Sequence, residues 1–388
     1  MSRKVNPIDL TSELIRCESI TPKSAGALDI IISYLESLGF HCRRIDFGEG
    51  LEKVENLYAR LGDIEPNICF AGHVDVVPTG DVNNWSVDPF GGEIKEGKIW
   101  GRGAADMKSG IAAFIAAVSD FLEIKKTMQG VGSISFIITS DEEGKALNGT
   151  KKVVEWLSSN SEVINGCIVG EPTNVAKIGD TIKIGRRGSL SGSLTVKGIQ
   201  GHVGYPHLAD NPINTLFKML EPISKVYLDK GTKDFQPSSA MITTIDVNNP
   251  ATNVIPGLAK AKFNIRFNTL HSKESLKVML EKHFNSITDN YELDFFCNAE
   301  PFLTNDDFLK STLQSAIKKI VNLNPDKSTS GGTSDARFIT KISPVIEFGL
   351  VGKTMHKIDE NVEVNDILDL TKIYNQFLFN YFGEKASD

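Results

Sequence analysis

Histidine and acidic residues follow several short apolar stretches of the sequence, and such side chains together are common ligands of divalent metal ions. His73 stands two residues before Asp75, and side chains at positions i and i+2 of an extended chain point the same way. A carboxylate behind a histidine fixes its tautomer, as it does for metal-bound histidines. A single His-x-Asp pair is weak evidence for a metal site, so the prediction depends on the other acids of the sequence.

Further acids occupy comparable positions along the chain. Asp106 directly precedes an expected helix, so capping that helix is an alternative role for it. Asp141, Glu142 and Glu143 follow an apolar run, where three adjacent acids are costly unless a cation or a hydrogen-bond network holds them. Glu171 follows another apolar run, in the segment Gly-Glu-Pro-Thr.

The elements around these acids can bring them together. Apolar runs predict buried strands at residues 67–72, 133–139 and 166–170, and amphipathic or apolar patterns predict helices at residues 25–38 and 107–124. Strands of this kind alternating with helices predict an α/β fold with a mostly parallel sheet covered on both faces. Open sheets of that type bind ligands outside the carboxyl ends of their strands.

Five ionisable groups fall at such strand ends or next to them, and no thiolate accompanies them. They are His73, Asp106, Glu142, Glu143 and Glu171. This donor set predicts a nitrogen and oxygen site for zinc or a similar divalent ion. Because the donors exceed one tetrahedral shell, they favour two ions that share a bridging group.

The pattern changes between residues 184 and 297. Strands with alternating polarity are expected at residues 189–198, 241–247, 259–267 and 291–297, with helices at residues 211–228 and 272–287. This β-α-β-β-α-β order predicts a ferredoxin-like α+β domain. A helix near residues 306–321 and a strand at residues 344–348 return to the first pattern. We therefore predict a catalytic domain at residues 1–183 and 298–388 that residues 184–297 interrupt.

Length and composition agree with two soluble domains. The chain has 388 residues, of which 40% are hydrophobic and 23% charged, with a net charge of −7. An acidic chain without a basic patch argues against a nucleic-acid partner. We find neither a membrane-spanning apolar stretch nor a secretory signal. Five scattered cysteines without a CxxC pair argue against zinc–sulfur and disulfide frameworks and favour the cytoplasm.

A nucleotide-binding loop is suggested by Gly352-Lys353-Thr354, the ending of a phosphate-binding motif. That motif requires a glycine five positions before Gly352, where this chain has Glu347. The glycine supplies the tight backbone turn around the phosphates, so the motif is incomplete. We therefore reject a nucleotide-binding function for this segment.

Two segments carry a resemblance to a known family. GHVDVVPTGD (residues 72–81) and WGRGAADMK (residues 100–108) are followed by the acidic pair and the Gly-Glu-Pro-Thr segment in the expected order. At these residues the chain resembles the metal-dependent amidohydrolases and peptidases that include aminoacylases and acetylornithine deacetylase. Val74 stands where relatives often have threonine, and it is not one of the expected ligands.

Segments outside the metal motifs refine the resemblance. They are GRRGSL (185–190), GHVGYPHLADNP (201–212), SGGTSD (330–335), EFG (347–349) and MHKIDE (355–360). They are most similar to family members that hydrolyse the succinyl amide of N-succinyl-LL-2,6-diaminopimelate, in diaminopimelate and lysine biosynthesis. The alternatives are another N-acyl amino-acid deacylase of the family, such as acetylornithine deacetylase, or a non-catalytic binding protein on the same fold.

The resemblance also implies roles for individual residues. Asp106 would bridge two ions, zinc at both sites or cobalt or manganese at one of them. The remaining ligands would be His73 and Glu171 for one ion, and Glu143 and His356 for the other. Glu142 would be the general base for a metal-activated bridging water. Asp75 would orient His73.

The inserted domain would form the surface of a homodimer. His202 would reach the partner's active site and stabilise the tetrahedral intermediate. A substrate with several carboxylates favours arginines in the cleft, and the motifs suggest Arg186 and Arg266, with Gly332 and Thr333 as further contacts. Arg266 lies on the polar face of an alternating strand, so a merely solvated side chain is the alternative.

Overall fold

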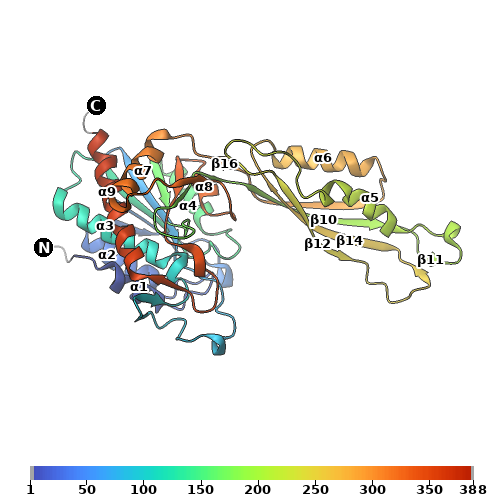
Figure 1. Ribbon diagram of the computed structural model, residues 1–388, viewed down its shortest axis with the longest axis horizontal. Helices are drawn as coiled ribbons and strands as arrows, with labels where there is room; N and C mark the ends of the chain where they lie inside the picture. Colours follow the sequence, from blue (N-terminus) through green and yellow to red (C-terminus); the bar gives the residue numbers. More distant parts are fainter. Residues whose placement is uncertain (1–3, 386–388) are drawn as a thin grey trace. The chain divides into compact units, whose positions relative to one another are not determined.

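The computed structural model describes residues 4–385, which form two compact units. The first unit comprises the chain up to Ile184, then Thr304–Ser328, and the chain from Ser334 onward. The second comprises Gly185–Leu303 and Thr329–Thr333. Figure 1 shows the helices and strands of each unit.

An eight-stranded mixed sheet forms the centre of the first unit. In spatial order its strands are β1 (His41–Arg44), β2 (Asn56–Leu61), β6 (Ser133–Thr139), β3 (Asn67–His73), β7 (Gly166–Val169), β18 (Val345–Glu347), β8 (Thr181–Lys183) and β17 (Asp326–Ser328). The adjacent strands β6, β3 and β7 are parallel and fully buried, which confirms the strands expected from the three apolar runs. The outer strands β1 and β2 are antiparallel to their neighbours.

Helices complete the first unit. They are α1 (Pro7–Ile15), α2 (Ala27–Ser37), α3 (Ser109–Lys125), α4 (Thr150–Ser159), α7 (Asp307–Val321), α8 (Ala336–Ile339) and α9 (Val364–Lys385). On one face of the sheet, the ring of Phe70 stacks on Phe114 of α3, with centroids 4.5 Å apart, and Tyr374 of α9 lies edge-on to both. Apolar surface buried between these aromatic rings holds α3 and α9 against the central strands.

A small antiparallel sheet extends the first unit. It consists of β4 (Glu93–Lys95), β5 (Lys98–Trp100) and β19 (Asn361–Glu363), with β5 in the middle. The pairing of β19 with β5 joins the chain near residue 100 to the chain near residue 360. Both segments that flank these strands carry residues of the expected metal site.

The second unit has the β-α-β-β-α-β order that the sequence predicts. Its elements are β10 (Gly188–Lys197), α5 (Pro212–Ser224), β12 (Ser239–Asp246), β14 (Leu258–Phe267), α6 (Lys273–Asn285) and β15 (Tyr291–Ala299). The four strands form an antiparallel sheet in the order β12-β14-β10-β15, and α5 and α6 lie on the same face of it (Figure 1). The alternation along β14 is confirmed, since Ala261, Phe263 and Ile265 are buried whereas Lys260 and Lys262 are exposed.

The unit boundaries differ from the sequence-based boundaries at two places. Residues 298–303 lie in the second unit, because β16 (Phe302–Leu303) pairs with β9 (Gly185–Arg186). Thr329–Thr333 also lie in the second unit, although the chain on either side belongs to the first. The hydroxyl of Thr329 donates a hydrogen bond to the carbonyl of Asp234, at 2.6 Å.

The structure also bears on two sequence-based expectations, those about membrane-spanning segments and about the cysteines. Within residues 4–385, the structure contains no helix with the length and apolar character needed to cross a membrane. The five cysteines all carry free thiols.

Candidate metal centre

The site lies at the carboxyl ends of three adjacent parallel strands in the middle of the main sheet. His73 is the last residue of β3, Glu142 and Glu143 follow β6, and Glu171 follows β7. Because β3 lies between β6 and β7 and runs parallel to both, these acids and the histidine meet at the carboxyl ends of the strands.

The first group of donors is His73, Asp106 and Glu171. Nε2 of His73 lies 3.2 Å from Oδ1 of Asp106 and 3.8 Å from Oε1 of Glu171. One donor atom from each of the three residues lies within 4.8 Å of the others, and all three side chains are buried. One imidazole and two carboxylates at this spacing can hold one divalent ion.

The second group of donors shares Asp106 with the first. Nε2 of His356 lies 2.7 Å from Oε1 of Glu143 and 3.2 Å from Oδ2 of Asp106. The two oxygens of Asp106 therefore face two different histidines, one from each group. A carboxylate placed this way can bridge two neighbouring ions.

Asp106 does not cap the helix that follows it. Helix α3 starts at Ser109, later than predicted, because residues Ala104–Lys108 form a short irregular turn. The N-cap position is held by Lys108, whose side chain makes no capping hydrogen bond. The Asp106 carboxylate is directed at the histidines instead, so the capping alternative is wrong.

Helix α3 begins close to the end of β7 because Gly110 has no side chain. A Cβ atom on Gly110 would lie 2.9 Å from the backbone oxygen of Gly170, the residue before Glu171. Any larger residue would push the start of α3 away from the strand. This contact helps to set the distance between Asp106 and Glu171.

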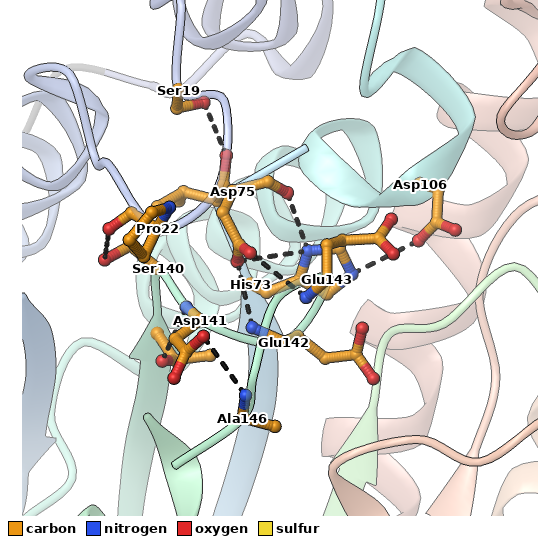
Figure 2. Close-up of polar contacts among 12 residues, drawn as sticks. Ser19, Pro22, His73, Asp75, Asp106, Ser140, Asp141, Glu142, Glu143 and Ala146 are labelled. Carbon is orange, nitrogen blue, oxygen red and sulfur yellow. Dashed lines mark hydrogen bonds and ion pairs between the residues drawn. The ribbon is translucent and has the colours of Figure 1, made fainter. Parts of the chain in front are cut away.

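Asp75 holds the site in a different way from the one expected. Nδ1 of His73 lies 2.9 Å from the backbone oxygen of Asp75, whereas the nearest carboxylate oxygen is 3.7 Å away. The carboxylate accepts the backbone N–H groups of Glu142 and Glu143, at 3.2 and 3.1 Å (Figure 2). Asp75 thus fixes the tautomer of His73 through its carbonyl and positions the acidic pair through its side chain.

The carboxylates of the three adjacent acids point in different directions. The Asp141 carboxylate accepts the backbone N–H groups of Ala146, Leu147 and Asn148, at 3.0 to 3.2 Å, and so closes the loop after β6. Figure 2 shows the carboxylate of Glu143 directed toward Asp106, with that of Glu142 lying apart from it. The divergence of Glu142 and Glu143 agrees with their position as neighbours in an extended segment.

The negatively charged carboxylates of the site favour positive charge on the groups next to them. Burial by itself lowers the pKa of His73, but the hydrogen bond to Asp106 and the charges of Glu171 and Asp106 outweigh it and raise that pKa well above its usual value. Hydrogen bonds to Asp106 and Glu143 raise the pKa of His356 to about 10. Crowded carboxylates with two imidazoles and no thiolate are the donors that zinc, cobalt and manganese accept, so the residues fit two divalent ions.

The remaining predicted site residues lie in the second unit. His202 is exposed, and its Nδ1 accepts the backbone N–H of Gly204 at 3.0 Å. Arg186 donates from Nη1 to the backbone oxygen of Ser330, at 3.3 Å. Arg266 is partly buried, and burial together with the nearby positive charge of Arg187 lowers its pKa.

Gly332 and Thr333 also belong to the second unit rather than to the domain predicted for them. Their segment is short, and Oγ1 of Thr333 lies 3.5 Å from the side-chain nitrogen of Asn298. The roles of these residues, and those of Arg186, Arg266 and His202, toward a substrate stay predictions.

The sequence analysis assigned no role to two charged residues beside the two donor groups. Arg102 and Glu360 stand in the segments that carry the family resemblance, and they are 2% and 0% exposed. Nη1 of Arg102 lies 2.7 Å from Oε2 of Glu360. Their place inside distinctive segments was the available signal, but burial cannot be seen in the residue types.

The fold and this site together define a metal-dependent hydrolase. The chain belongs to peptidase family M20/M25/M40, whose model matches residues 69–380. It is 54% identical to a succinyl-diaminopimelate desuccinylase from Rhodospirillum centenum, over 97% of this chain and 98% of that protein. It is 52% identical to a protein of the same name from Pelagibacter ubique, over 97% and 99% of the two chains. Among solved structures, it is similar to the aminopeptidase PepT from Bacillus cereus, with a TM-score of 0.76, 19% identity and coverage of 97% and 99%.

Zinc titration into chelator-treated protein tests the two donor groups. We expect about two ions per chain, because Asp106 can serve both groups. Glu171→Ala and Glu143→Ala should each bind about one ion, since each removes a donor from a different group. Glu155→Ala, on the exposed face of α4, should retain both ions. Calorimetry with elemental analysis measures the stoichiometry, and two ions retained in both single-site variants would contradict the assignment.

Proposed function

We propose that the chain hydrolyses the succinyl amide of N-succinyl-LL-2,6-diaminopimelate to succinate and LL-2,6-diaminopimelate, as a step of diaminopimelate and lysine biosynthesis. The observation that carries the proposal is a full donor set around Asp106 in a chain that is 54% identical, over nearly its whole length, to a protein named for that reaction. The acid expected to act as the base, Glu142, is also present beside the donors.

The metal ions in this proposal are zinc, with cobalt or manganese possible at one position by their shared preference for nitrogen and oxygen donors. His73, Asp106 and Glu171 would hold one ion, and Asp106, Glu143 and His356 the other. When bound, the ions would lower the pKa of a water molecule and polarise the amide carbonyl.

The protein's own residues handle the proton. One donor atom each of Glu142, His73 and Glu143 lie within 4.8 Å of one another, but neither group around Asp106 includes Glu142. In this proposal its carboxylate therefore accepts the proton of the attacking water. As the oxygen adds to the succinyl carbonyl carbon, the bond from that carbon to nitrogen weakens. Glu142 then delivers the proton to the departing amine, and succinate and the free amino group result.

His202 supplies a hydrogen-bond donor in this proposal. Because its Nδ1 accepts the N–H of Gly204, a neutral His202 carries its proton on Nε2. An Nε2–H group can donate to the oxyanion that develops on the carbonyl oxygen. We propose that the second unit forms a homodimer and that His202 acts in the partner's active site.

In this proposal the substrate's carboxylates bind to cationic side chains and to hydrogen-bond donors of the backbone. Arg186 and Arg266 would bind them, with Gly332 and Thr333 contributing an N–H group and a hydroxyl. Arg187 lies close enough to Arg266 to lower its pKa, so positive charge is concentrated on this part of the second unit. We propose a cytoplasmic location for the enzyme, with no nucleic-acid or membrane partner.

The direct test is a parallel assay of zinc-loaded protein on N-succinyl-LL-2,6-diaminopimelate and N-acetylornithine. We expect turnover of the succinyl substrate, with kcat/KM at least tenfold above that of the acetyl substrate, and loss of turnover after chelation that zinc restores. A preference for N-acetylornithine would favour the deacetylase alternative. No hydrolysis of either amide by fully metal-loaded protein would favour a binding protein.

Two substitutions separate proton transfer and oxyanion stabilisation from metal binding. Glu142→Gln should lower kcat by about 10²–10⁴-fold, and His202→Ala by about 10²–10³-fold. Both variants should keep the parent's zinc stoichiometry, because neither residue belongs to the two groups around Asp106. His283→Ala, on α6, is the matched control and should retain full activity. Normal turnover in Glu142→Gln would remove the proposed base.

A further inference from the structure

A buried ion pair lies beside the metal centre without contributing to either donor group. Oε2 of Glu360 accepts from Nη1 of Arg102 at 2.7 Å, and both side chains are almost fully buried. Nη2 of Arg102 donates to the backbone oxygen of Pro78 at 3.3 Å, and the guanidinium lies 5.2 Å from the ring centre of Trp85. These contacts fix the guanidinium on several sides.

The other oxygen of Glu360 holds the backbone that carries Asp106. Oε1 of Glu360 accepts the N–H of Ala105 at 2.9 Å and the N–H of Asp106 at 3.2 Å. Ala105 and Asp106 stand at the start of the single π-helical turn Ala104–Lys108, where backbone N–H groups find no acceptor within the turn itself. The carboxylate of Glu360 therefore determines where the turn places Asp106.

Arg102 also holds the segment that carries His356. Its Nη1 donates to the backbone oxygen of Lys357, the next residue along, at 3.1 Å. His356 itself has a φ of 62°, a left-handed conformation that a non-glycine residue keeps only when its surroundings enforce it. The side chain of His356 is 47% exposed, so packing against neighbouring side chains does little to fix it.

The pairing of the two segments supports this arrangement. Asn361 in β19 pairs with Trp100 in β5, and the N–H of Gly101 donates to the backbone oxygen of Glu360 at 2.9 Å. Backbone pairing brings the segments into register, and the ion pair then joins the parts that carry ligands. A buried ion pair rarely adds much net stability, because desolvation offsets the attraction, so a geometric role accounts better for its presence.

We propose that Arg102 and Glu360 are positioning residues that set the distance between His356 and Asp106, and so the affinity of the ion held by Asp106, Glu143 and His356. The other ion depends on them less, because His73 and Glu171 come from the ends of buried strands. The inference rests on the proposed metal centre but not on the identity of the substrate.

The experiment measures each ion separately. Arg102→Lys keeps the charge but loses the planar fork that reaches Glu360, Lys357 and Pro78 together. In a Glu171→Ala background, which leaves the group with His356, Arg102→Lys should weaken zinc binding by about 10- to 100-fold. In a Glu143→Ala background, which leaves the group with His73, the same substitution should weaken zinc binding by less than about threefold, and calorimetry measures both.

A second variant and a control distinguish a specific effect on zinc binding from a general loss of structure. Glu360→Gln should give the same selective weakening, and excess zinc should restore the activity of Glu360→Gln and Arg102→Lys in the parent chain. Arg60→Lys alters another ion pair of the first unit, with Glu162, and should leave both affinities unchanged. Urea unfolding of the metal-free proteins verifies that each variant is folded.

The results separate this inference from the proposed reaction. Equal weakening in both backgrounds or unchanged affinity in both would overturn the positioning role. If the parent protein is active, activity that excess zinc does not restore in the folded variants would overturn it as well. Selective weakening supports it, even if the parent protein does not hydrolyse the succinyl substrate. Absence of hydrolysis in that case counts against the proposed reaction alone.

Discussion

The carboxylate of Asp106, shared between His73 and His356, is the contact on which the rest of the site depends. These two histidines are 283 positions apart in the chain, and one comes from a buried strand while the other comes from an exposed loop. Concentrated negative charge in a buried place is unfavourable unless positive charge accompanies it. The same carboxylates raise the pKa values of both histidines, and divalent cations held by these side chains would offset the negative charge.

Strands and loops position the donor side chains of the site in different ways. His73 ends β3 and Glu171 follows β7 by two residues, so both are positioned by parallel strands whose spacing is fixed by backbone hydrogen bonds. Asp106 lies in an irregular turn, and His356 lies in a turn two residues after the short 3₁₀ helix Gly352–Thr354, so neither belongs to a regular α-helix or strand. Asp75 holds the acidic pair, and Glu360 with Arg102 holds the two loop ligands. Polar side chains that bind backbone groups thus position the donors that lie outside regular secondary structure.

Much of this arrangement could be predicted from sequence because it follows repeating physical patterns. Apolar runs identified β3, β6 and β7, and the acids after them indicated a common site at the strand ends. His356 has no such context and was assigned through the family resemblance alone. The tautomer contact of Asp75 was expected from its carboxylate but is made by its carbonyl, because residue types do not report backbone direction.

Other features depend on contacts between distant segments. The antiparallel outer strands β1 and β2 contain ordinary mixtures of polar and apolar residues that gave no clear strand signal. The second unit takes in Thr329–Thr333 through contacts such as that of Thr329 with Asp234. The run of serine, threonine and glycine at residues 328–334 is typical of a loop, but it does not indicate which unit the loop joins. The burial of Arg102 and Glu360 is likewise a tertiary property. Such features require the folded arrangement to be known.

Anomalous diffraction at the zinc absorption edge, from crystals of the zinc-loaded protein, tests the central claim most directly. The account predicts two peaks about 3.5–4 Å apart, both within bonding distance of Asp106, with His73 beside one and His356 beside the other. A single peak, or two peaks of which one is not bound by Asp106, would contradict it.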